Sequence, residues 1–384
     1  MLRSILTYYA KARENDAFGL LLRPKVLANL RRFDQESKAR PLTMTSAPPG
    51  IEIELTNRCN LACVQCLRSR GLKPYALGDL SFENYQRILA QFPYLTHLGL
   101  NGFGEPLLHN RFFDVVAYTR REKPSCKITI YSNGLLIDAD RAARLMDCGV
   151  KDLNISIDAA IPLTYQRVRR GGRLQVVHEN IRRLMQVRRD TRARFPRVGL
   201  NFVMLNENEG ELVPFVEQAA DFGVDFINCI SYASYDWGFR NCRTPGSYRR
   251  ELDAAAARMA QLGVRCKSFP SPDLSWTDPR HGFDCSFFWG TSVRVAFSGD
   301  VTLGCCSPFK ENYSYGNVLQ QPFSEIWNNA QFQRNRALAL HRTPPNAICA
   351  SCDAFCRSFF APRTDGRYIR LQPVAVPSTI PAPR

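Results

Sequence analysis

The stretch Ile51-Glu52-Ile53-Glu54-Leu55-Thr56-Asn57-Arg58-Cys59-Asn60-Leu61-Ala62-Cys63-Val64-Gln65-Cys66 joins an apolar, strand-like run to three closely spaced cysteines. A cubane iron–sulfur cluster is usually held by four thiolates. Three thiolates would leave one iron open to an outside ligand, and an open iron is a reaction site. Two other interpretations stay open: three incidental cysteines, or three of the four ligands of a structural zinc.

The spacing Cys-x3-Cys-x2-Cys at the end of a strand resembles the signature of the radical S-adenosylmethionine (radical SAM) enzymes. In that family the amino and carboxylate groups of SAM occupy the fourth iron of a [4Fe–4S] cluster. An electron from the cluster then cleaves SAM to a 5′-deoxyadenosyl radical. The resemblance implies that Cys59, Cys63 and Cys66 are the cluster ligands. Gln65 departs from the family, which usually has an aromatic residue at that position.

Composition indicates a globular protein of a reducing compartment. The chain has 384 residues, 45% of them apolar, which is enough for a sizeable core. Its 14 cysteines cluster at short spacings, which favours metal or cluster ligation over a disulfide framework. No run approaches the ~18 apolar residues of a membrane span, and the N-terminal apolar run is too broken for a signal peptide. We therefore expect a cytoplasmic protein without a membrane span.

The net charge of +16, from 51 basic and 35 acidic residues, favours anionic partners. These include a phosphorylated or carboxylated metabolite, an acidic peptide and an anionic electron donor. The aromatic interleaving and sequence-reading motifs of nucleic-acid-binding modules are absent, so nucleic acid is an unlikely substrate.

Six strand-like runs alternate with amphipathic, helix-like segments, which predicts an α/β protein with a parallel sheet. The runs lie at residues 51–55, 97–100, 127–131, 153–157, 198–205 and 226–232. Helix-like segments begin after Ser81 and lie at residues 111–120, 139–148, 176–192 and 212–222. Periodicity does not separate an open doubly wound sheet from a barrel. The radical SAM resemblance implies a partial (β/α)6 TIM-like barrel.

We divide the chain into five parts. Residues 1–50 form a helical N-terminal extension and linker, with a candidate helix at 20–30, and residues 51–245 form the barrel. Residues 246–280 are expected to be a bridging helix and linker. Residues 281–360 form a small cysteine-rich, cluster-binding domain, and the proline-rich tail 361–384 is expected to be disordered.

Polar motifs follow three of the runs, where the ligand chemistry of parallel barrels gathers. Gly102-Phe103-Gly104-Glu105 follows the second run, Ser132-Asn133-Gly134 the third and Ser156-Ile157-Asp158-Ala159 the fourth. Each motif taken alone is typical of a turn. The family resemblance implies SAM-binding roles for the residues that match its motifs. These roles are binding of the methionyl amine by Gly104 and Glu105, lining of the SAM pocket by Asn133, binding of the ribose by Ser156 and Asp158, and binding of the methionyl carboxylate by Arg169, with Arg167 and Arg170 as alternatives.

A second cysteine group lies near the C-terminus, at Cys285, Cys305, Cys306, Cys349, Cys352 and Cys356. The pair Cys349 and Cys352 has a spacing that metals favour, and a zinc ribbon stays open as one interpretation. The sequence around the group resembles the SPASM/Twitch extension, which binds auxiliary [4Fe–4S] clusters. The resemblance implies one auxiliary cluster, with ligands Cys285, Cys305, Cys349 and Cys352. Cys306 is an alternative to Cys305, and Cys356 is a spare thiol, a substitute ligand or a hydrogen donor.

These features predict an enzyme that reductively cleaves SAM and abstracts hydrogen from a small polar or anionic metabolite. The outcome would be oxidation, epimerisation or rearrangement, with electrons from a low-potential donor such as flavodoxin or ferredoxin. The alternative within the same class is a maturase that modifies a ribosomally made peptide. The alternative from another class is a non-catalytic iron–sulfur or zinc scaffold or electron carrier, which would not bind SAM.

Overall fold

The structure is a computed structural model that describes residue 19 and residues 23–70, 76–231, 245–270, 285–290, 293–303 and 314–345. Within these residues the main sheet has nine strands, in the order β11-β10-β1-β3-β4-β5-β7-β8-β9. Every neighbouring pair is parallel except β10 and β11. The strands are β1 (Gly50–Ile53), β3 (His97–Leu100), β4 (Lys127–Ser132), β5 (Asp152–Ser156), β7 (Arg197–Met204), β8 (Phe226–Ser231), β9 (Cys266–Ser268), β10 (Val293–Val295) and β11 (Val301–Leu303).

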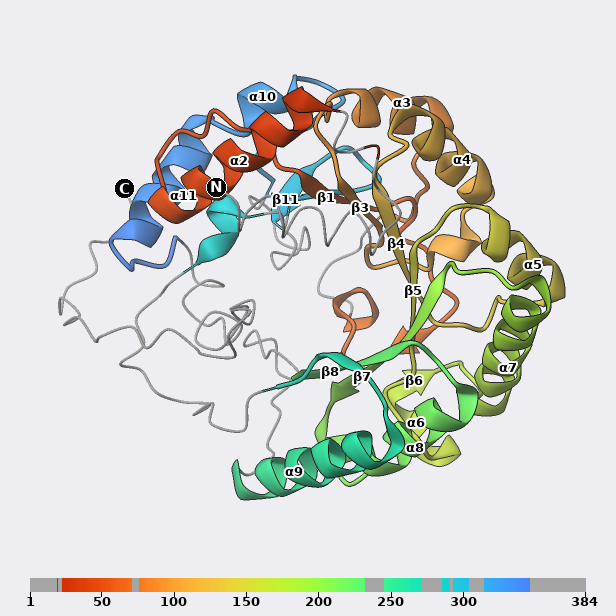
Figure 1. Cartoon of the computed structure of the whole chain (residues 1–384). Helices are drawn as coiled ribbons and strands as arrows, with labels where there is room; N and C mark the ends of the chain where they lie inside the picture. The colour runs from red at the N-terminus through yellow and green to blue at the C-terminus, as the bar shows by residue number, and fades with distance from the viewer. Residues whose placement is uncertain are drawn as a thin grey trace.

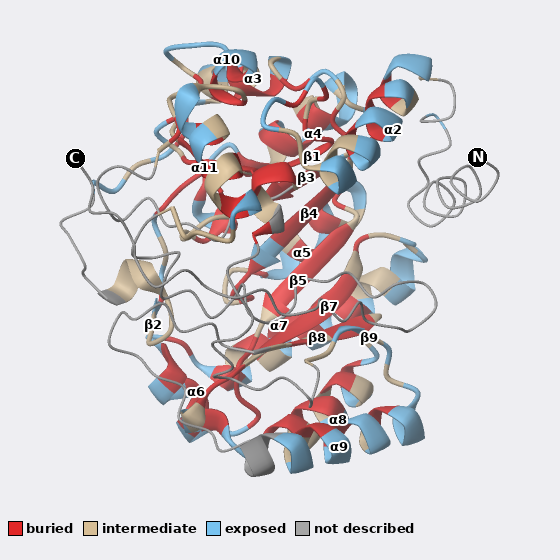
Figure 2. Cartoon of the chain, turned by 90° about the vertical axis from the view of Figure 1, so that its left-hand side faces the viewer, coloured by how far each residue is buried: buried red, intermediate tan, exposed pale blue. Residues whose placement is uncertain are grey.

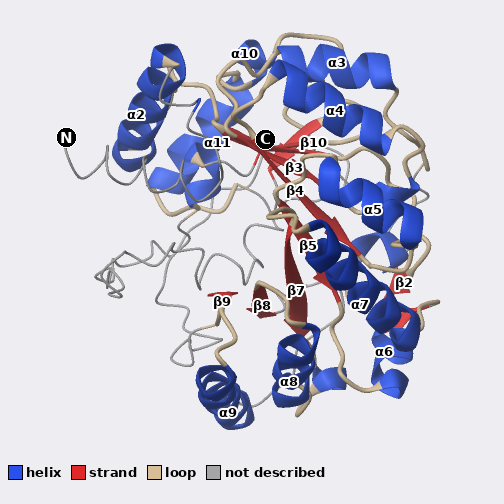
Figure 3. Cartoon of the chain, turned by 45° about the vertical axis from the view of Figure 1, so that its right-hand side comes forward, coloured by secondary structure: helices blue, strands red, loops and turns tan. Residues whose placement is uncertain are grey.

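Helices cover the outer side of this curved sheet, as Figures 1 and 3 show. The helices are α2 (Pro24–Ala39), α3 (Phe82–Ala90), α4 (Phe112–Glu122), α5 (Ala139–Asp147), α6 (Pro162–Val168), α7 (Leu174–Thr191), α8 (Leu212–Phe222), α9 (Pro245–Leu262), α10 (Phe323–Ile326) and α11 (Ala330–Leu340). Short 3-10 turns are η2 (Leu67–Arg70), η3 (Pro106–Leu108), η4 (Asn206–Asn208) and η5 (Ser286–Trp289). The predicted α/β fold class is confirmed, and the six predicted runs match β1, β3, β4, β5, β7 and β8 to within two residues at each end.

The two faces of each strand carry different chemistry, because successive side chains point to opposite sides. In β4, Ile128 and Ile130 are fully buried in the core between sheet and helices. Thr129 and Tyr131, between and after them, line the inside of the barrel. Figure 2 shows the buried strands beside helices that are buried toward the sheet and exposed on their outer surfaces. The outer face of the sheet therefore holds the hydrophobic core, and the inner face holds polar groups.

Two segments that the sequence places outside the barrel extend its sheet. Residues 246–280 contain most of α9 (Pro245–Leu262) and also β9, which pairs in parallel with β8. The cysteine-rich region contributes β10, which pairs in parallel with β1 from Ile51 to Ile53. Three-residue strands carry too little alternation to be recognised from sequence. The C-terminal region therefore continues the barrel sheet.

The N-terminal extension is bound to the C-terminal region by buried polar contacts. Arg336 of α11 is fully buried and donates from Nη1 to the carbonyl of Leu42 at 2.9 Å. Trp289 donates to the carbonyl of Pro41 at 2.7 Å, and Trp327 to that of Ser46 at 3.1 Å. The helix that the structure describes in this extension spans Pro24–Ala39 and ends later than the predicted 20–30, of which residues 20–22 lie outside the described part.

The predicted proline-rich tail, Cys305, Cys306, Cys349, Cys352 and Cys356 lie outside the described residues. Among the helices that the structure does describe, none is long and apolar enough to cross a bilayer.

Candidate active site

The three-cysteine loop begins just after β1 and is fixed to the end of α6. β2 (Ala62–Cys63) pairs antiparallel with β6 (Arg169–Arg170), and Cys63 lies opposite Arg169 in the register. The Cys66 amide donates to the Cys63 carbonyl at 3.1 Å. Arg169 Nη1 also lies 4.0 Å from Cys63 Sγ. The backbone thus holds the cysteine loop beside a buried guanidinium.

The thiols fit an iron–sulfur cluster by their chemistry. Cys59, Cys63 and Cys66 are reduced and half-buried. Burial raises the pKa of Cys59, and it raises that of Cys63 to about 11, with the neighbouring thiols adding to both shifts. Because metal ligation requires thiolates, a cluster would have to displace these protons. The Asn133 side-chain amide lies 3.9 Å from Cys59 Sγ and, like Arg169, is a donor placed to stabilise negative sulfur.

The described part of the chain has no group of three His, Cys, Asp or Glu side chains converging on one metal ion. A cubane makes a different demand, because each of its thiolates binds a different iron. The three sulfurs therefore need to surround a cluster without meeting at one point. Two of them, in Cys59 and Cys63, each have an N–H donor nearby that would stabilise a cluster-bound thiolate.

Glu105 connects the ends of two strands beside the cysteine loop. It is 2% exposed, and its Oε1 accepts from the Ser132 hydroxyl at 2.9 Å and the Leu107 amide at 3.2 Å. Its Oε2 accepts from the Asn133 amide at 2.7 Å. Burial raises the pKa of this carboxyl, although these donors oppose the shift. A carboxylate accepts about four hydrogen bonds, so Oε2 keeps room for one more donor.

Gly104 and Asn133 shape the same corner. A Cβ on Gly104 would lie 2.1 Å from the Thr56 carbonyl oxygen, so only glycine fits against the strand that leads to the cysteines. Asn133 is 6% exposed, and its Nδ2 donates to Asn60 Oδ1 at 2.7 Å. The two motifs that follow β3 and β4 therefore meet the cysteine loop directly.

Asp158 and Arg169 form a buried ion pair, with Nη2 and Oδ2 2.5 Å apart. Asp158 is fully buried at a positive φ of 58° and also accepts from Gln65 Nε2 at 2.6 Å and the Val203 amide at 2.8 Å. The Asp158 carboxylate thus binds the Arg169 guanidinium, the cysteine loop and the backbone of β7 in this structure. Its contact with a ribose stays a prediction. Arg169 is buried, whereas the alternatives Arg167 and Arg170 are exposed.

Ser156, the other predicted ribose contact, is the half-buried last residue of β5 and pairs with Asn201 of β7. Of the predicted auxiliary-cluster ligands only Cys285 is described, and it is buried at the start of η5.

Sequence reasoning missed Asn60 and the role of Gln65. Both contact residues more than 70 positions away in the chain, Asn133 and Asp158. The only signal for Gln65 was its departure from the family's aromatic residue.

Comparison with known proteins identifies two domains. Residues 53–219 match the radical SAM superfamily, and residues 285–353 match the iron–sulfur cluster-binding SPASM domain. The PqqA peptide cyclase of Streptomyces rochei is 30% identical over 315 residues, which cover 80% of this chain and 82% of that protein. The chain belongs to the radical SAM superfamily. It is a radical SAM enzyme with a SPASM domain, and this membership implies a SAM-binding [4Fe–4S] cluster, SAM and auxiliary iron–sulfur binding.

Two further similarities extend over most of this radical SAM chain. The tungsten-containing aldehyde ferredoxin oxidoreductase cofactor-modifying protein of Pyrococcus furiosus is 29% identical, over 82% of this chain and 90% of that protein. The structure of Streptococcus suis SuiB bound to precursor peptide SuiA has a TM-score of 0.62 at 15% identity, covering 86% of this chain and 75% of SuiB. The second likeness shows the shared fold.

Proposed function

We propose that this protein is a radical SAM maturase that modifies a peptide. The similarity to the PqqA peptide cyclase carries the proposal, because it covers 80% of this chain at 30% identity. SuiB supports it at the level of fold, since that protein holds a precursor peptide on the same architecture. The sequence-based preference for a small metabolite is therefore replaced by its peptide alternative.

Different residues around the cysteine loop bind the cluster and the parts of SAM. Cys59, Cys63 and Cys66 hold the cluster, which when bound supplies the electron that cleaves SAM. Glu105 offers the remaining acceptor position of Oε2 to the methionyl ammonium, a charge-assisted hydrogen bond. Gly104 lets the Glu105 segment pack against the backbone that leads to the cysteines, because a Cβ there would lie 2.1 Å from the Thr56 carbonyl oxygen.

Four residues complete the proposed SAM pocket. Arg169 directs its charge at the methionyl carboxylate and is held in place by Asp158. Asn133 lines the pocket, and Ser156 and Asp158 border the ribose. Cys285, Cys349, Cys352 and either Cys305 or Cys306 hold the auxiliary cluster, and a low-potential flavodoxin or ferredoxin supplies the electrons.

The first test is anaerobic reconstitution, reduction and assay of 5′-deoxyadenosine released from SAM. Cys59→Ala should abolish release and lower bound iron by one cluster, whereas Cys148→Ala should do neither. Cys148 is a suitable control because its thiol lies at the end of α5 and contacts the Leu145 carbonyl. Undiminished iron and 5′-deoxyadenosine in Cys59→Ala would refute the assignment of the cluster.

The second test concerns the substrate. Short peptides encoded beside the gene are incubated with the reduced enzyme and SAM, and their masses are compared before and after. A change in peptide mass that requires SAM and Cys59 supports the maturase. Modification of a small metabolite, with every such peptide unchanged, would contradict it.

A further inference from the structure

A cavity of about 340 Å³ lies inside the barrel, on the inner faces of β1, β3 and β4. The residues that give it polar character are Glu52, His97, Asn101, Thr129 and Tyr131. A volume of this size is typical of a pocket for a small ligand or a side chain. From the walls of the cavity, β3 and β4 run toward Glu105 and Asn133 at their carboxyl ends.

Two buried polar atoms on the cavity wall lack a hydrogen-bond partner within the described residues, Thr129 Oγ1 and Asn101 Oδ1. Thr129 is only 6% exposed. An unsatisfied buried polar group costs about 1–3 kcal/mol, so these two atoms indicate that a ligand or ordered water belongs beside them. The hydroxyl can donate, and the amide oxygen can accept.

Gly99 makes the space in front of Asn101. A Cβ at this position would lie 2.4 Å from Asn101 Oδ1 and 3.2 Å from Glu52 Cγ. Any larger residue would therefore occupy the cavity or displace the amide. The cavity therefore depends on the presence of glycine at position 99, inside the buried strand β3.

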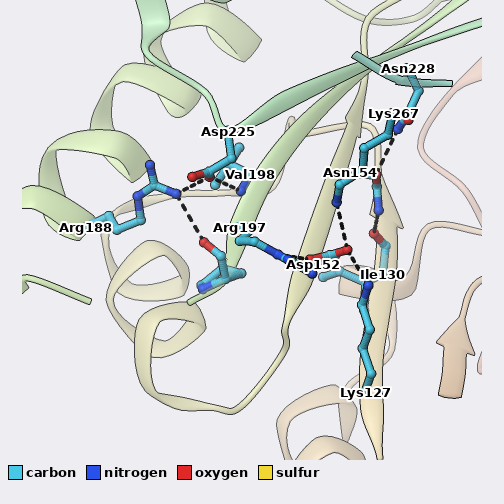
Figure 4. A network of polar contacts seen from close by, with 11 residues as sticks. Lys127, Ile130, Asp152, Asn154, Arg188, Arg197, Val198, Asp225, Asn228 and Lys267 are labelled. Carbon is cyan, nitrogen blue, oxygen red and sulfur yellow. Dashed lines mark hydrogen bonds and ion pairs between the residues drawn. The ribbon is translucent and has the colours of Figure 1, made fainter. Parts of the chain in front are cut away.

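The floor beside the cavity carries excess positive charge. Asp152 lies within 2.7 Å of Lys127 and of Arg197, and 3.2 Å from Lys267 (Figure 4). Three cations around one carboxylate leave a formal excess of two positive charges. The register places Lys127 beside His97, and Asp152 beside Thr129, so this charge borders the cavity wall.

The negative charge on the opposite wall is already compensated. Glu52 is bound by Arg294, whose Nη2 lies 2.6 Å from its Oε2. Burial, together with the nearby Lys127, lowers the pKa of His97 to about 4, so this imidazole is neutral near pH 7 and adds no charge of its own. The cavity therefore has an available hydroxyl donor and an available amide acceptor, with excess positive charge on residues next to its lining.

We propose that this cavity binds a carboxylate of the substrate, with Thr129 donating to the carboxylate, the Lys127 ammonium attracting its charge from beside the cavity wall, and Asn101 accepting from an adjacent amide N–H. The inference rests on the proposed function, in which the carboxylate belongs to an aspartate or glutamate of the peptide. Asn101 lies four residues before Glu105, and Tyr131 two before Asn133, so an acidic side chain anchored here sets which neighbouring residue lies beside SAM. A free dicarboxylate offers the same charge without the peptide backbone.

The test measures binding to the anaerobic, reconstituted enzyme with SAM present. The probes are acetyl-Ala-Glu-Ala-amide, the matching Gln and Lys peptides, and glutarate. The Glu peptide should bind about tenfold more tightly than the Gln peptide, the effect of one charge-assisted contact. Lys127→Met and Thr129→Val should each reduce this ratio to below about threefold.

Lys25→Met is the matched control, because Lys25 is an exposed lysine of α2, and it should keep the full ratio. Thr129→Val removes the hydroxyl but keeps nearly the same side-chain shape, so it should fold. It therefore tests the proposal even if Lys127→Met does not fold. Equal binding of the Glu and Gln peptides by the unaltered protein, or unchanged discrimination in Thr129→Val and a folded Lys127→Met, would overturn the proposal.

Two results separate this proposal from the proposed function. Release of 5′-deoxyadenosine without discrimination between Glu and Gln would overturn the carboxylate site alone. Binding of glutarate that depends on Thr129, with no binding of any peptide, would support the carboxylate site and overturn the peptide substrate.

Discussion

Glu105 and Asp152 are both buried carboxylates, but they lie at opposite ends of the barrel strands and have opposite surroundings. Glu105 follows β3 at the carboxyl end and accepts only from uncharged N–H and O–H groups, so that burial raises its pKa. Asp152 begins β5 and is surrounded by three cations, which outweigh burial and lower its pKa to about 2. The first keeps an acceptor position available for a ligand, whereas the charge of the second is more than neutralised by its neighbours and stabilises the fold.

The largest expected effect comes from Asp152→Asn. It leaves Lys127, Arg197 and Lys267 close together without a counter-charge, so we expect the free energy of unfolding to fall by about 3 kcal/mol. Urea unfolding of the anaerobic protein measures it. Asp34→Asn is the control, because its pair with Lys38 is exposed and should contribute less than about 0.5 kcal/mol. Equal losses of unfolding free energy in the two variants would show that Asp152 has no special role in stability.

Glu105→Gln should have a smaller effect than Asp152→Asn. The free energy that changes should be that of SAM binding and not that of unfolding. The substitution keeps the size of the side chain but removes the charge offered to the methionyl ammonium, so SAM affinity should fall about tenfold. Calorimetric titration of the reconstituted enzyme with SAM measures the change. Glu83→Gln, exposed in the first turn of α3, should leave the affinity unaltered. If Glu105→Gln bound SAM as tightly as the unaltered protein, the assigned role of Glu105 would be wrong.

The smallest expected effect is the pH dependence. The pKa of Asp152 lies below its ordinary 3.8, so its stabilising contribution is full above about pH 4 and is lost as pH falls through about 2. Between pH 5 and pH 3 the advantage of the unaltered protein over Asp152→Asn should therefore shrink by about 1 kcal/mol. A difference that grows as the pH falls would reverse the assigned sign.

The sequence predicts the parts of this molecule that rest on local patterns. The six barrel strands follow from apolar runs such as the one that contains Ile128 and Ile130, because every second side chain must enter the core. The three cysteines and the strand-end motifs were recognisable because their spacing is short. Structure brings Glu105, Asn133 and Arg169 around the cysteine loop, but their SAM contacts stay predictions.

Contacts between distant segments could not be predicted. Gln65 and Asp158 are 93 residues apart, and no periodic signal relates an amide to a buried carboxylate. Neither did any pattern indicate that Asp152 gathers cations from β4, β7 and β9. The preference for a small metabolite arose in part from net charge, which describes the whole surface and says little about one binding site.

Because β10 pairs in parallel with β1, removing the C-terminal region from this chain would expose an edge of the barrel sheet. A chain ending before residue 285 would leave this side of β1 as an open sheet edge, and the Glu54 amide would lose its acceptor, the Val295 carbonyl. Exposed edges of this kind recruit other strands and lead to aggregation. Engineering that exchanges SPASM regions between relatives should therefore carry the β10–β11 hairpin along with the barrel.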